Sequence, residues 1–198
     1  MFVIGLTGSI AMGKTTTARL FAEEGVPVHD ADAAVHKLYA GEAAGLIEAA
    51  FPGSTRNGTV DRVQLGKQVT GDPTALRRLE EIVHPLVRNA ERKFLRDAEI
   101  AGASIVVLDV PLLFETGGDS RVDATVVVSA PAERQRERVL ERGVSLERLE
   151  ALLGRQMPDA EKRRRADFVV DSAQGVEHAR AQVRQILAAV AKMPTRRK

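Results

Sequence analysis

The sequence of 198 residues contains no cysteine and no tryptophan, and only 4% of its residues are aromatic. Without cysteine the protein has no disulfide, no thiolate nucleophile, no zinc–thiolate site and no iron–sulfur cluster. So few aromatic side chains argue against a base-stacking surface for single-stranded nucleic acid. The apolar stretch Phe2–Leu6 follows no basic residue and is too short for a signal peptide or a membrane span. We therefore expect a soluble, cytoplasmic protein.

The charge of the chain also gives no indication of a nucleic-acid or membrane partner. The formal net charge is +2, but the last three residues are Arg196, Arg197 and Lys198, and without them the balance is −1. Hydrophobic residues make up 44% of the chain and charged residues 28%, which is ordinary globular usage and argues against disorder. The length corresponds to one domain with room for an insertion.

Short apolar runs alternate with helical segments along the chain. The predicted strands are 2–6, 26–28, 104–109, 123–129 and 167–170. The predicted helices outside the middle of the chain are 14–24, 132–142, 145–156 and 176–191. A strand, a helix and a strand within the first 28 residues form a parallel crossover unit. The pattern predicts an α/β fold whose five-stranded sheet is mostly parallel.

The segment from Ala31 to Gly102 is mainly helical in pattern and longer than a crossover requires. We expect a loop at 53–58 and a helix that begins after Asp72, with Pro85 bending or breaking it. Part of this segment is interpreted as an insertion that builds a substrate site. At the other end of the chain, the residues after Lys192 are expected to form a frayed basic tail.

Residues Gly8–Thr15 match the phosphate-loop (P-loop) motif G-x-x-x-x-G-K-[ST], and they lie between a predicted strand and a predicted helix. The glycines let backbone N–H groups surround phosphate oxygens, and the helix N-terminus adds partial positive charge. Lys14 is expected to reach the β- and γ-phosphates, and the Thr15 hydroxyl to bind Mg²⁺. The predicted ATP-binding residues are Gly8, Ser9, Ile10, Ala11, Met12, Gly13, Lys14, Thr15 and Thr16.

A P-loop by itself does not say what becomes of the γ-phosphate. GTPases carry an Asn-Lys-x-Asp element, whereas the two asparagines of this chain, Asn57 and Asn89, occur in other contexts. Motor-type ATPases usually have a glutamate beside the aspartate at the strand end, but here Asp109 is followed by Val110 and Pro111. Both observations favour transfer to a bound acceptor over hydrolysis.

Carboxylates follow two of the predicted strands, where the ligand crevice of a parallel sheet lies. Asp32 is placed to accept a proton from an attacking hydroxyl, which favours an alcohol acceptor, because a phosphate acceptor needs no base. Asp109 is placed to hold Mg²⁺ directly or through water. Asp30 and Asp32 are also compatible with simple helix capping, and Asp109 with a capped strand end.

Arg134, Arg138 and Arg142 form one stripe on the predicted helix 132–142. The stripe indicates either a solvated helix with salt bridges or a mobile lid whose arginines hold the transferring phosphoryl group. The basic run 162–165 is interpreted as a solvated face. Among the histidines, only His84 is a site candidate, since the others show no metal-ligand spacing.

Five segments in order resemble dephospho-CoA kinase. They are IGLTGSIAMGKTT at 4–16, VPVHDAD at 26–32, HPLV at 84–87, VLDVPLLFE at 107–115 and ADFVVDS at 166–172. The basic helix 135–142 and Gln156-Met157-Pro158 also fit the family. The combination of the DAD and DVPLLFE elements with the P-loop is specific to this family, whereas the P-loop alone occurs in many families.

The resemblance implies a P-loop kinase of the nucleoside-monophosphate-kinase type that phosphorylates the ribose 3′-hydroxyl of dephospho-CoA with ATP and Mg²⁺, the last step of coenzyme A synthesis. It implies Asp32 as the base, with Lys14, Arg142 and Arg138 stabilising the moving phosphoryl group. Asp32, His84 and Leu112 are the implied acceptor-binding residues. The acceptor insertion corresponds to 33–101 and the lid to 134–157. No nucleic acid, membrane or obligate protein partner is implied.

Three positions depart from the family pattern. Residues 9–12 stand where glycines and a serine are common, so we expect altered loop stiffness rather than lost binding. Ser172 stands where asparagine is frequent, which leaves adenine recognition there unassigned, and Arg155 has no assignable role. Two alternatives stay open at this point: a kinase for another nucleotide or small metabolite, and a non-catalytic nucleotide-dependent switch.

Overall fold

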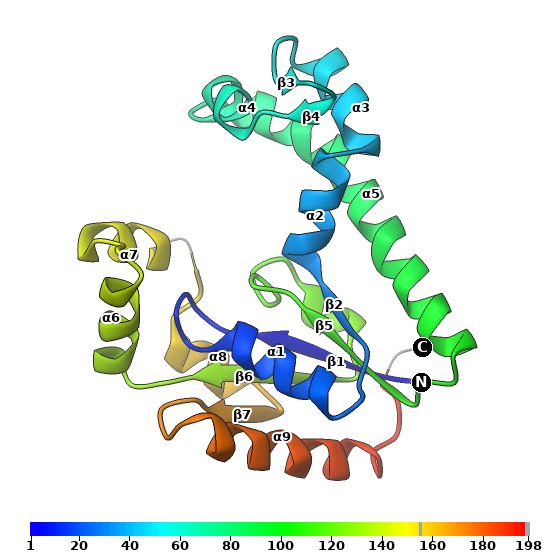
Figure 1. Cartoon of the computed structure of the whole chain (residues 1–198), viewed down its shortest axis with the longest axis vertical. Helices are drawn as coiled ribbons and strands as arrows, with labels where there is room; N and C mark the ends of the chain where they lie inside the picture. Colours follow the sequence, from blue (N-terminus) through cyan, green and yellow to red (C-terminus); the bar gives the residue numbers. More distant parts are fainter. Residues whose placement is uncertain (155, 197–198) are drawn as a thin grey trace. The chain divides into compact units, whose positions relative to one another are not determined.

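The computed structural model describes residues 1–154 and 156–196, and its helices and strands are labelled in Figure 1. The chain divides into two compact units. The first unit contains Met1–His29 and Ala98–Lys198, and the second contains Asp30–Asp97. Each unit has its own hydrophobic core, so each is described by itself.

The first unit is built on a five-stranded sheet with the strand order β2-β5-β1-β6-β7. The strands are β1 (Phe2–Thr7), β2 (Val28–Asp30), β5 (Ile105–Asp109), β6 (Ala124–Ser129) and β7 (Phe168–Asp171). β1 pairs in parallel with β5 and β6, and β6 pairs in parallel with β7. All six residues of β1 and of β6 are buried, because helices or loops cover both faces of the sheet. The predicted fold class is confirmed.

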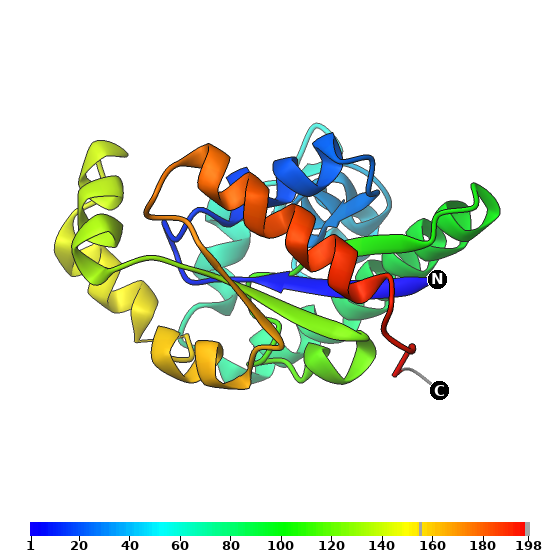
Figure 2. The same cartoon turned by 90° about the horizontal axis from the view of Figure 1, so that it is seen from below.

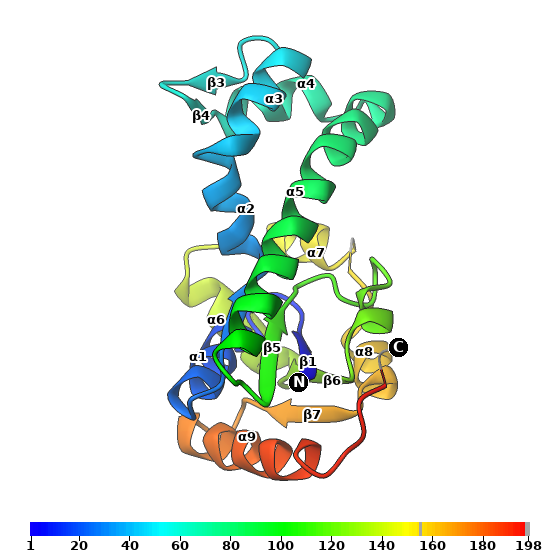
Figure 3. The same cartoon turned by 90° about the vertical axis from the view of Figure 1, so that its right-hand side faces the viewer.

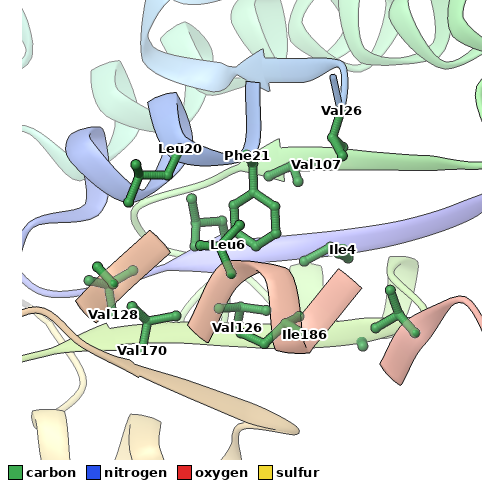
Figure 4. Packing of buried hydrophobic residues seen from close by; sticks show 14 of the residues in the cluster. Ile4, Leu6, Leu20, Phe21, Val26, Val107, Val126, Val128, Val170 and Ile186 are labelled. Atoms are coloured by element: carbon green, nitrogen blue, oxygen red, sulfur yellow. The ribbon is translucent and has the colours of Figure 1, made fainter. Parts of the chain in front are cut away.

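Helices α1 (Lys14–Glu23) and α9 (Val176–Val190) lie side by side on one face of this sheet, as Figure 2 shows. Alternate residues of β1 point to this face, where Ile4 and Leu6 pack with Leu20 and Phe21 of α1 (Figure 4). Gly5 points the other way, and a Cβ there would lie 2.8 Å from Leu113 Cδ2. The segment that follows β5 therefore closes the opposite face over β1.

The rest of the first unit consists of short helices. They are the 3₁₀ helix η1 (Gly118–Arg121), α6 (Ala132–Glu141), α7 (Leu146–Leu153) and α8 (Asp159–Arg165). α8 packs against β6 and was not predicted, because its charged residues hide the face that is buried. Among the described residues, no helix is long and apolar enough to cross a membrane.

The second unit is mainly helical, as predicted (Figure 3). Its elements are α2 (Ala31–Tyr39), α3 (Glu42–Ala50), β3 (Thr55–Arg56), β4 (Thr59–Val60), α4 (Arg62–Val69) and most of α5 (Pro73–Ile100). Its core is formed by buried residues from all of the helices. They include Leu38, Ile47, Phe51, Leu65, Leu79 and Val83.

Two local expectations in the second unit are wrong in part. The segment 53–58 is not only a loop, since β3 and β4 pair as an antiparallel hairpin whose turn residues Asn57 and Gly58 have positive φ angles of 52° and 74°. Pro85 does not break α5, which is continuous from Pro73 to Ile100, and a bend at Pro85 stays a prediction. The helix is held on both sides of the proline, because Val83 before it and Leu86 after it pack into the core.

The predicted frayed tail is also wrong for the residues that the structure describes. Met193 packs against the main core, and the Arg196 backbone N–H donates to Asp123 Oδ1 at 2.8 Å. The Arg196 guanidinium donates to Asp167 Oδ1 at 2.8 Å. Burial acts to raise the pKa of Asp167, but hydrogen bonds from Thr125 and Arg196 outweigh it and hold that pKa below its ordinary value. Residues 197 and 198 lie outside the described residues.

Candidate active site

The P-loop connects β1 to α1 at the carboxyl edge of the sheet. Gly13 is the residue before α1 and has a φ of 93°, a conformation that favours glycine. A Cβ at Gly13 would lie 3.0 Å from the Ser172 side chain, so the loop also needs glycine for space. Ala11 has a φ of 59°, which is unusual for a residue other than glycine. The loop is therefore held in a specific, locally strained conformation.

The Lys14 ammonium group lies 2.5 Å from Asp109 Oδ1. Asp109 is the last residue of β5, the strand beside β1, and its side chain is only 4% exposed. The structure thus brings together two residues that are 95 positions apart and that were both predicted as site residues. The cation needed for the phosphates is held at the mouth of the loop by a carboxylate.

The same residues suit a magnesium ion that arrives with a nucleotide. Magnesium in such sites uses one or two protein oxygens, and phosphates and water supply the rest. The buried Asp109 carboxylate and the exposed Thr15 hydroxyl at the start of α1 are donors of this kind. Within residues 1–154 and 156–196 there is no group of three or more His, Cys, Asp or Glu side chains that could hold a metal by itself.

The outer side of the P-loop is bound by three side chains. Gln135 Nε2 donates to the Ile10 carbonyl at 2.7 Å, and Arg138 Nη1 donates to the Ala11 carbonyl at 3.3 Å. Ser172 Oγ donates to the Met12 carbonyl at 2.6 Å. Gln135 was not predicted from the sequence. One signal was present, because Gln135 lies one turn before Val139 on α6 and therefore shares the buried face of that helix.

Arg138 is thereby engaged with two partners, because its guanidinium also donates to Ser172 Oγ at 2.9 Å and to the Ser172 carbonyl at 2.6 Å. The predicted arginine stripe lines one side of a cavity of about 420 Å³ beside the P-loop. The loop after β7 lines the other side. The lining includes Gly13, Arg134, Arg138, Arg142, Ser172 and Val176.

The segment that follows β5 is joined to α8 by a buried ion pair. Lys162 Nζ lies 2.9 Å from Glu115 Oε1, and the Lys162 side chain is fully buried. The same Glu115 oxygen accepts a hydrogen bond from the Met157 N–H at 2.8 Å. Burial acts to raise the pKa of Glu115, but the bonds from Lys162 and Met157 outweigh it and lower that pKa. The interpretation of 162–165 as a solvated face is wrong for Lys162 and correct for the exposed Arg163, Arg164 and Arg165.

In the second unit, Asp30 is the N-cap of α2, and its Oδ1 accepts the Ala33 N–H at 2.9 Å. Asp32 lies in the first turn of the helix and is exposed. The capping alternative therefore applies to Asp30. The Asp32 side chain lines a cavity of about 490 Å³ that was not predicted from the sequence. Its lining includes Asp32, His36, Tyr39, Arg62, Leu65 and Leu79.

Within this cavity the Arg62 guanidinium stacks 5.2 Å above the centre of the Tyr39 ring. Burial raises the pKa of Tyr39, and the nearby Arg62 charge opposes this only in part. The phenol consequently stays neutral at physiological pH and can donate a hydrogen bond. A carboxylate, a guanidinium and a phenol thus share one apolar-walled cavity.

The other two predicted acceptor residues do not line this cavity. His84 lines a different hollow on α5 with Arg77, Arg88 and Arg92. Leu112 belongs to the first unit, where it is 39% exposed in the segment after β5. Arg155 lies outside the described residues.

Comparison with known proteins decides the family. The family model described as dephospho-CoA kinase matches residues 2–178, which is most of the chain. The chain belongs to the dephospho-CoA kinase family. The dephospho-CoA kinase of Bradyrhizobium diazoefficiens is 63% identical over 198 residues, covering both chains completely. That of Brucella melitensis is 56% identical over 195 residues and covers 98% of each chain.

Solved structures agree with the dephospho-CoA kinase fold. A crystal structure of a protein from Thermus thermophilus is 36% identical, covers 98% of both chains and has a TM-score of 0.84. The dephospho-CoA kinase of Campylobacter jejuni is 24% identical with a TM-score of 0.66, covering 95% of this chain and 96% of its own. The family resemblance predicted from the motifs is confirmed, and the non-catalytic switch alternative is set aside. This protein is a phosphotransferase.

Proposed function

We propose that this chain transfers the γ-phosphoryl group of ATP to the ribose 3′-hydroxyl of dephospho-CoA, with the P-loop holding the nucleotide and Asp32 acting as the base. The family reaction gives coenzyme A and ADP and is the last step of coenzyme A biosynthesis. The observation that carries the assignment of roles is the pairing of Lys14 with Asp109 at the carboxyl ends of two adjacent parallel strands. This is where a parallel α/β sheet binds its ligand.

On the nucleotide side, we assign the polyphosphate to residues 8–16 and the adenosine to the cavity between α6 and the loop after β7. The cavity borders the P-loop at Gly13 and Thr16, so a nucleotide can occupy both places at once. Lys14 would exchange its bond to Asp109 for the β- and γ-phosphate oxygens. We further propose that Thr15 and Asp109 hold Mg²⁺, which neutralises phosphate charge when bound.

The lid arginines are assigned different tasks. Arg142 ends α6 and lines the nucleotide cavity, where its charge can stabilise the transferring phosphoryl group. Arg138 is bound to the Ala11 carbonyl and to Ser172, which favours a role in holding the loop over direct contact with the moving group. The lid boundaries 134–157 and the acceptor insertion 33–101 stay predictions.

On the acceptor side, we assign dephospho-CoA to the second unit, with the reacting ribose near Asp32. In the transfer, the 3′-oxygen forms a bond to the γ-phosphorus, the bond from that phosphorus to the β,γ-bridging oxygen breaks, and ADP leaves. The proton of the hydroxyl passes to the Asp32 carboxylate. Arg62 and Tyr39 offer a cation and a neutral donor to the anionic acceptor in the same cavity. His84 and Leu112 stay predicted acceptor contacts.

We also propose that the enzyme works in the cytoplasm on ATP and dephospho-CoA alone. The sequence supports this assignment, because the net charge apart from the last three residues is close to zero and the chain has no cysteine.

The proposed roles can be tested with an Asp32→Asn variant in a coupled assay of ADP release. We expect kcat to fall by about 100-fold or more, as for the loss of a general base, while KM for ATP changes by less than about threefold. Asp97→Asn, a carboxylate exchange at an exposed residue of the same unit, is the matched control and should retain full activity. Normal turnover of Asp32→Asn with dephospho-CoA would remove Asp32 from the mechanism. If the unsubstituted protein turned over faster with adenosine or AMP than with dephospho-CoA, the proposed acceptor would be wrong.

A further inference from the structure

Three consecutive carbonyls of the P-loop point to side chains of other elements. The Ile10, Ala11 and Met12 carbonyls accept hydrogen bonds from Gln135, Arg138 and Ser172. Because the two groups of a trans peptide point in opposite directions, a carbonyl held outward turns the next N–H inward. Two of the N–H groups so turned are those of Ala11 and Gly13, whereas the Met12 N–H closes a turn on the Ser9 carbonyl at 3.2 Å.

The P-loop conformation needs this external support. Ala11 is in the left-handed region with φ of 59°, which costs a residue with a Cβ about 1–2 kcal/mol. A strained residue of this kind persists only where its surroundings hold it. Residues 9–12 contain no glycine, so this loop lacks the intrinsic freedom that glycine gives.

The donors themselves are fixed in place. Gln135 is 5% exposed on α6, and Val139 one turn later packs with Ala11 of the loop and Leu149 of α7. Ser172 is anchored by its N–H, which donates to the Ser129 carbonyl at 3.0 Å. The side chains that support the loop are therefore themselves held by packing and by a backbone hydrogen bond.

We propose that Gln135 is a positioning residue of the P-loop: its carboxamide holds the Ile10 carbonyl outward and thereby presents the Ala11 N–H to the polyphosphate. Arg138 and Ser172 complete the set of supports but also line the nucleotide cavity. Gln135 does not contribute to that cavity lining, so its effect on phosphate binding can be separated from base recognition. This inference rests on the proposed assignment of the P-loop to the ATP polyphosphate.

The test uses Gln135→Met, which keeps the length and volume of the side chain and removes the donor. Three probes are titrated into the full-length protein: tripolyphosphate, ATP and adenosine. We expect the Kd values of tripolyphosphate and ATP to rise about tenfold, which corresponds to about 1.4 kcal/mol for one buried hydrogen bond. The Kd of adenosine should change by less than about twofold. In the kinase assay KM for ATP should rise while KM for dephospho-CoA stays constant.

Two variants and a control make the result decisive. Gln135→Asn keeps the carboxamide but is one methylene too short to reach Ile10, so it should reproduce the Gln135→Met effect even if Gln135→Met does not fold. Glu133→Gln, on the exposed side of the same helix, should bind all three probes like the parent.

Lys14→Met separates this inference from the function on which it rests. If Lys14→Met weakens tripolyphosphate binding but neither Gln135 variant does, the positioning role is overturned while the P-loop assignment stands. If the adenosine and tripolyphosphate Kd values rise together, Gln135 acts through the fold and the proposal also fails. If Lys14→Met leaves tripolyphosphate binding unchanged, the polyphosphate is not bound by this loop at all.

Discussion

The two units of this protein carry their site residues in contrasting ways. In the first unit, Lys14, Asp109 and the P-loop carbonyls are bound by buried or partly buried partners that come from distant parts of the chain. In the second unit, Asp32 and His84 are exposed on helices that pack around a separate small core. The first unit therefore holds its candidate site residues through contacts with other elements, whereas the second unit carries them on exposed helix surfaces.

The contrast has a physical reason. Binding a polyphosphate requires several backbone N–H groups that point to the same place. The backbone keeps this orientation when other side chains hold the carbonyls of the same peptides. An exposed carboxylate that accepts a proton needs little more than access to solvent and substrate. Changes in the first unit should therefore affect nucleotide binding and stability, and changes in the second unit should affect acceptor kinetics alone.

The most severe test of this contrast is Lys14→Met. We expect kcat/KM for ATP to fall by about 1,000-fold, because one preorganised charge at the phosphoryl group is lost. Coupled measurement of ADP release gives the value. Lys93→Met, at a lysine that is 70% exposed, is the control and should be fully active. An unchanged kcat/KM for Lys14→Met would contradict the assignment of Lys14 to the phosphates of ATP.

Next in size is the effect of Lys162→Met on stability, because this change leaves the Glu115 carboxylate buried without its cation. We expect a loss of about 3 kcal/mol, seen as a fall in Tm of roughly 6–12 °C. Adding Glu115→Gln to the Lys162→Met variant should restore part of the loss, since no charge is then buried. Equal Tm values for the parent and Lys162→Met would show that the pair contributes nothing.

The same pair predicts a pH dependence. The folded-state pKa of Glu115 is lowered, so its stabilising effect is present above the ordinary glutamate pKa and is lost as the pH falls through the folded value. The difference in stability between the parent and Lys162→Met should narrow as the pH falls below the ordinary glutamate range and through the lowered folded-state pKa of Glu115, where this carboxylate becomes protonated. Chemical denaturation at a series of pH values measures this difference, and a constant difference would contradict the assignment.

A moderate effect is expected from Arg62→Gln in the second unit. Removing a charged donor from the cavity that Asp32 lines should raise KM for dephospho-CoA about tenfold, because a hydrogen bond to a charged group contributes about 1.5–3 kcal/mol. KM for ATP and Tm should stay within error of the parent. A rise in KM for ATP instead would contradict the assignment of acceptor binding to the second unit and of nucleotide binding to the first.

The smallest expected effect is that of Arg196→Ala at the end of the described chain. Arg196 is 56% exposed, so the loss of its bond to Asp167 should lower stability at pH 7 by about 0.5 kcal/mol. The pKa of Asp167 is lowered in the folded state, so this contribution should vanish as the pH falls through that folded value. Denaturant titration at pH 7 and at acid pH checks both parts, with Arg136→Ala on the exposed side of α6 as the control.

Sequence reasoning worked best where structure is local. Strand β1 and the start of α1 were placed to within one residue, because a buried run and a P-loop glycine define them. It failed for Lys162 in α8, because a run of charged residues gave no sign that one face of this helix is buried. It also failed to predict that α5 continues through Pro85, where packing on both sides of the proline stabilises the helix. It also missed Gln135, whose function depends on a carbonyl 125 positions away.

The parallel sheet, the phosphate loop and the family can be predicted from the sequence alone, because short-range patterns encode buried strands and because the P-loop and the family motifs require particular residue types. Which side chains meet depends instead on how the chain packs in three dimensions. This packing joined Lys14 to Asp109, buried Lys162 against Glu115, and set Gln135, Arg138 and Ser172 on the outside of the loop. The reason is that such contacts follow from the register of neighbouring strands and from the packing of helices on them, which no local pattern of residues encodes.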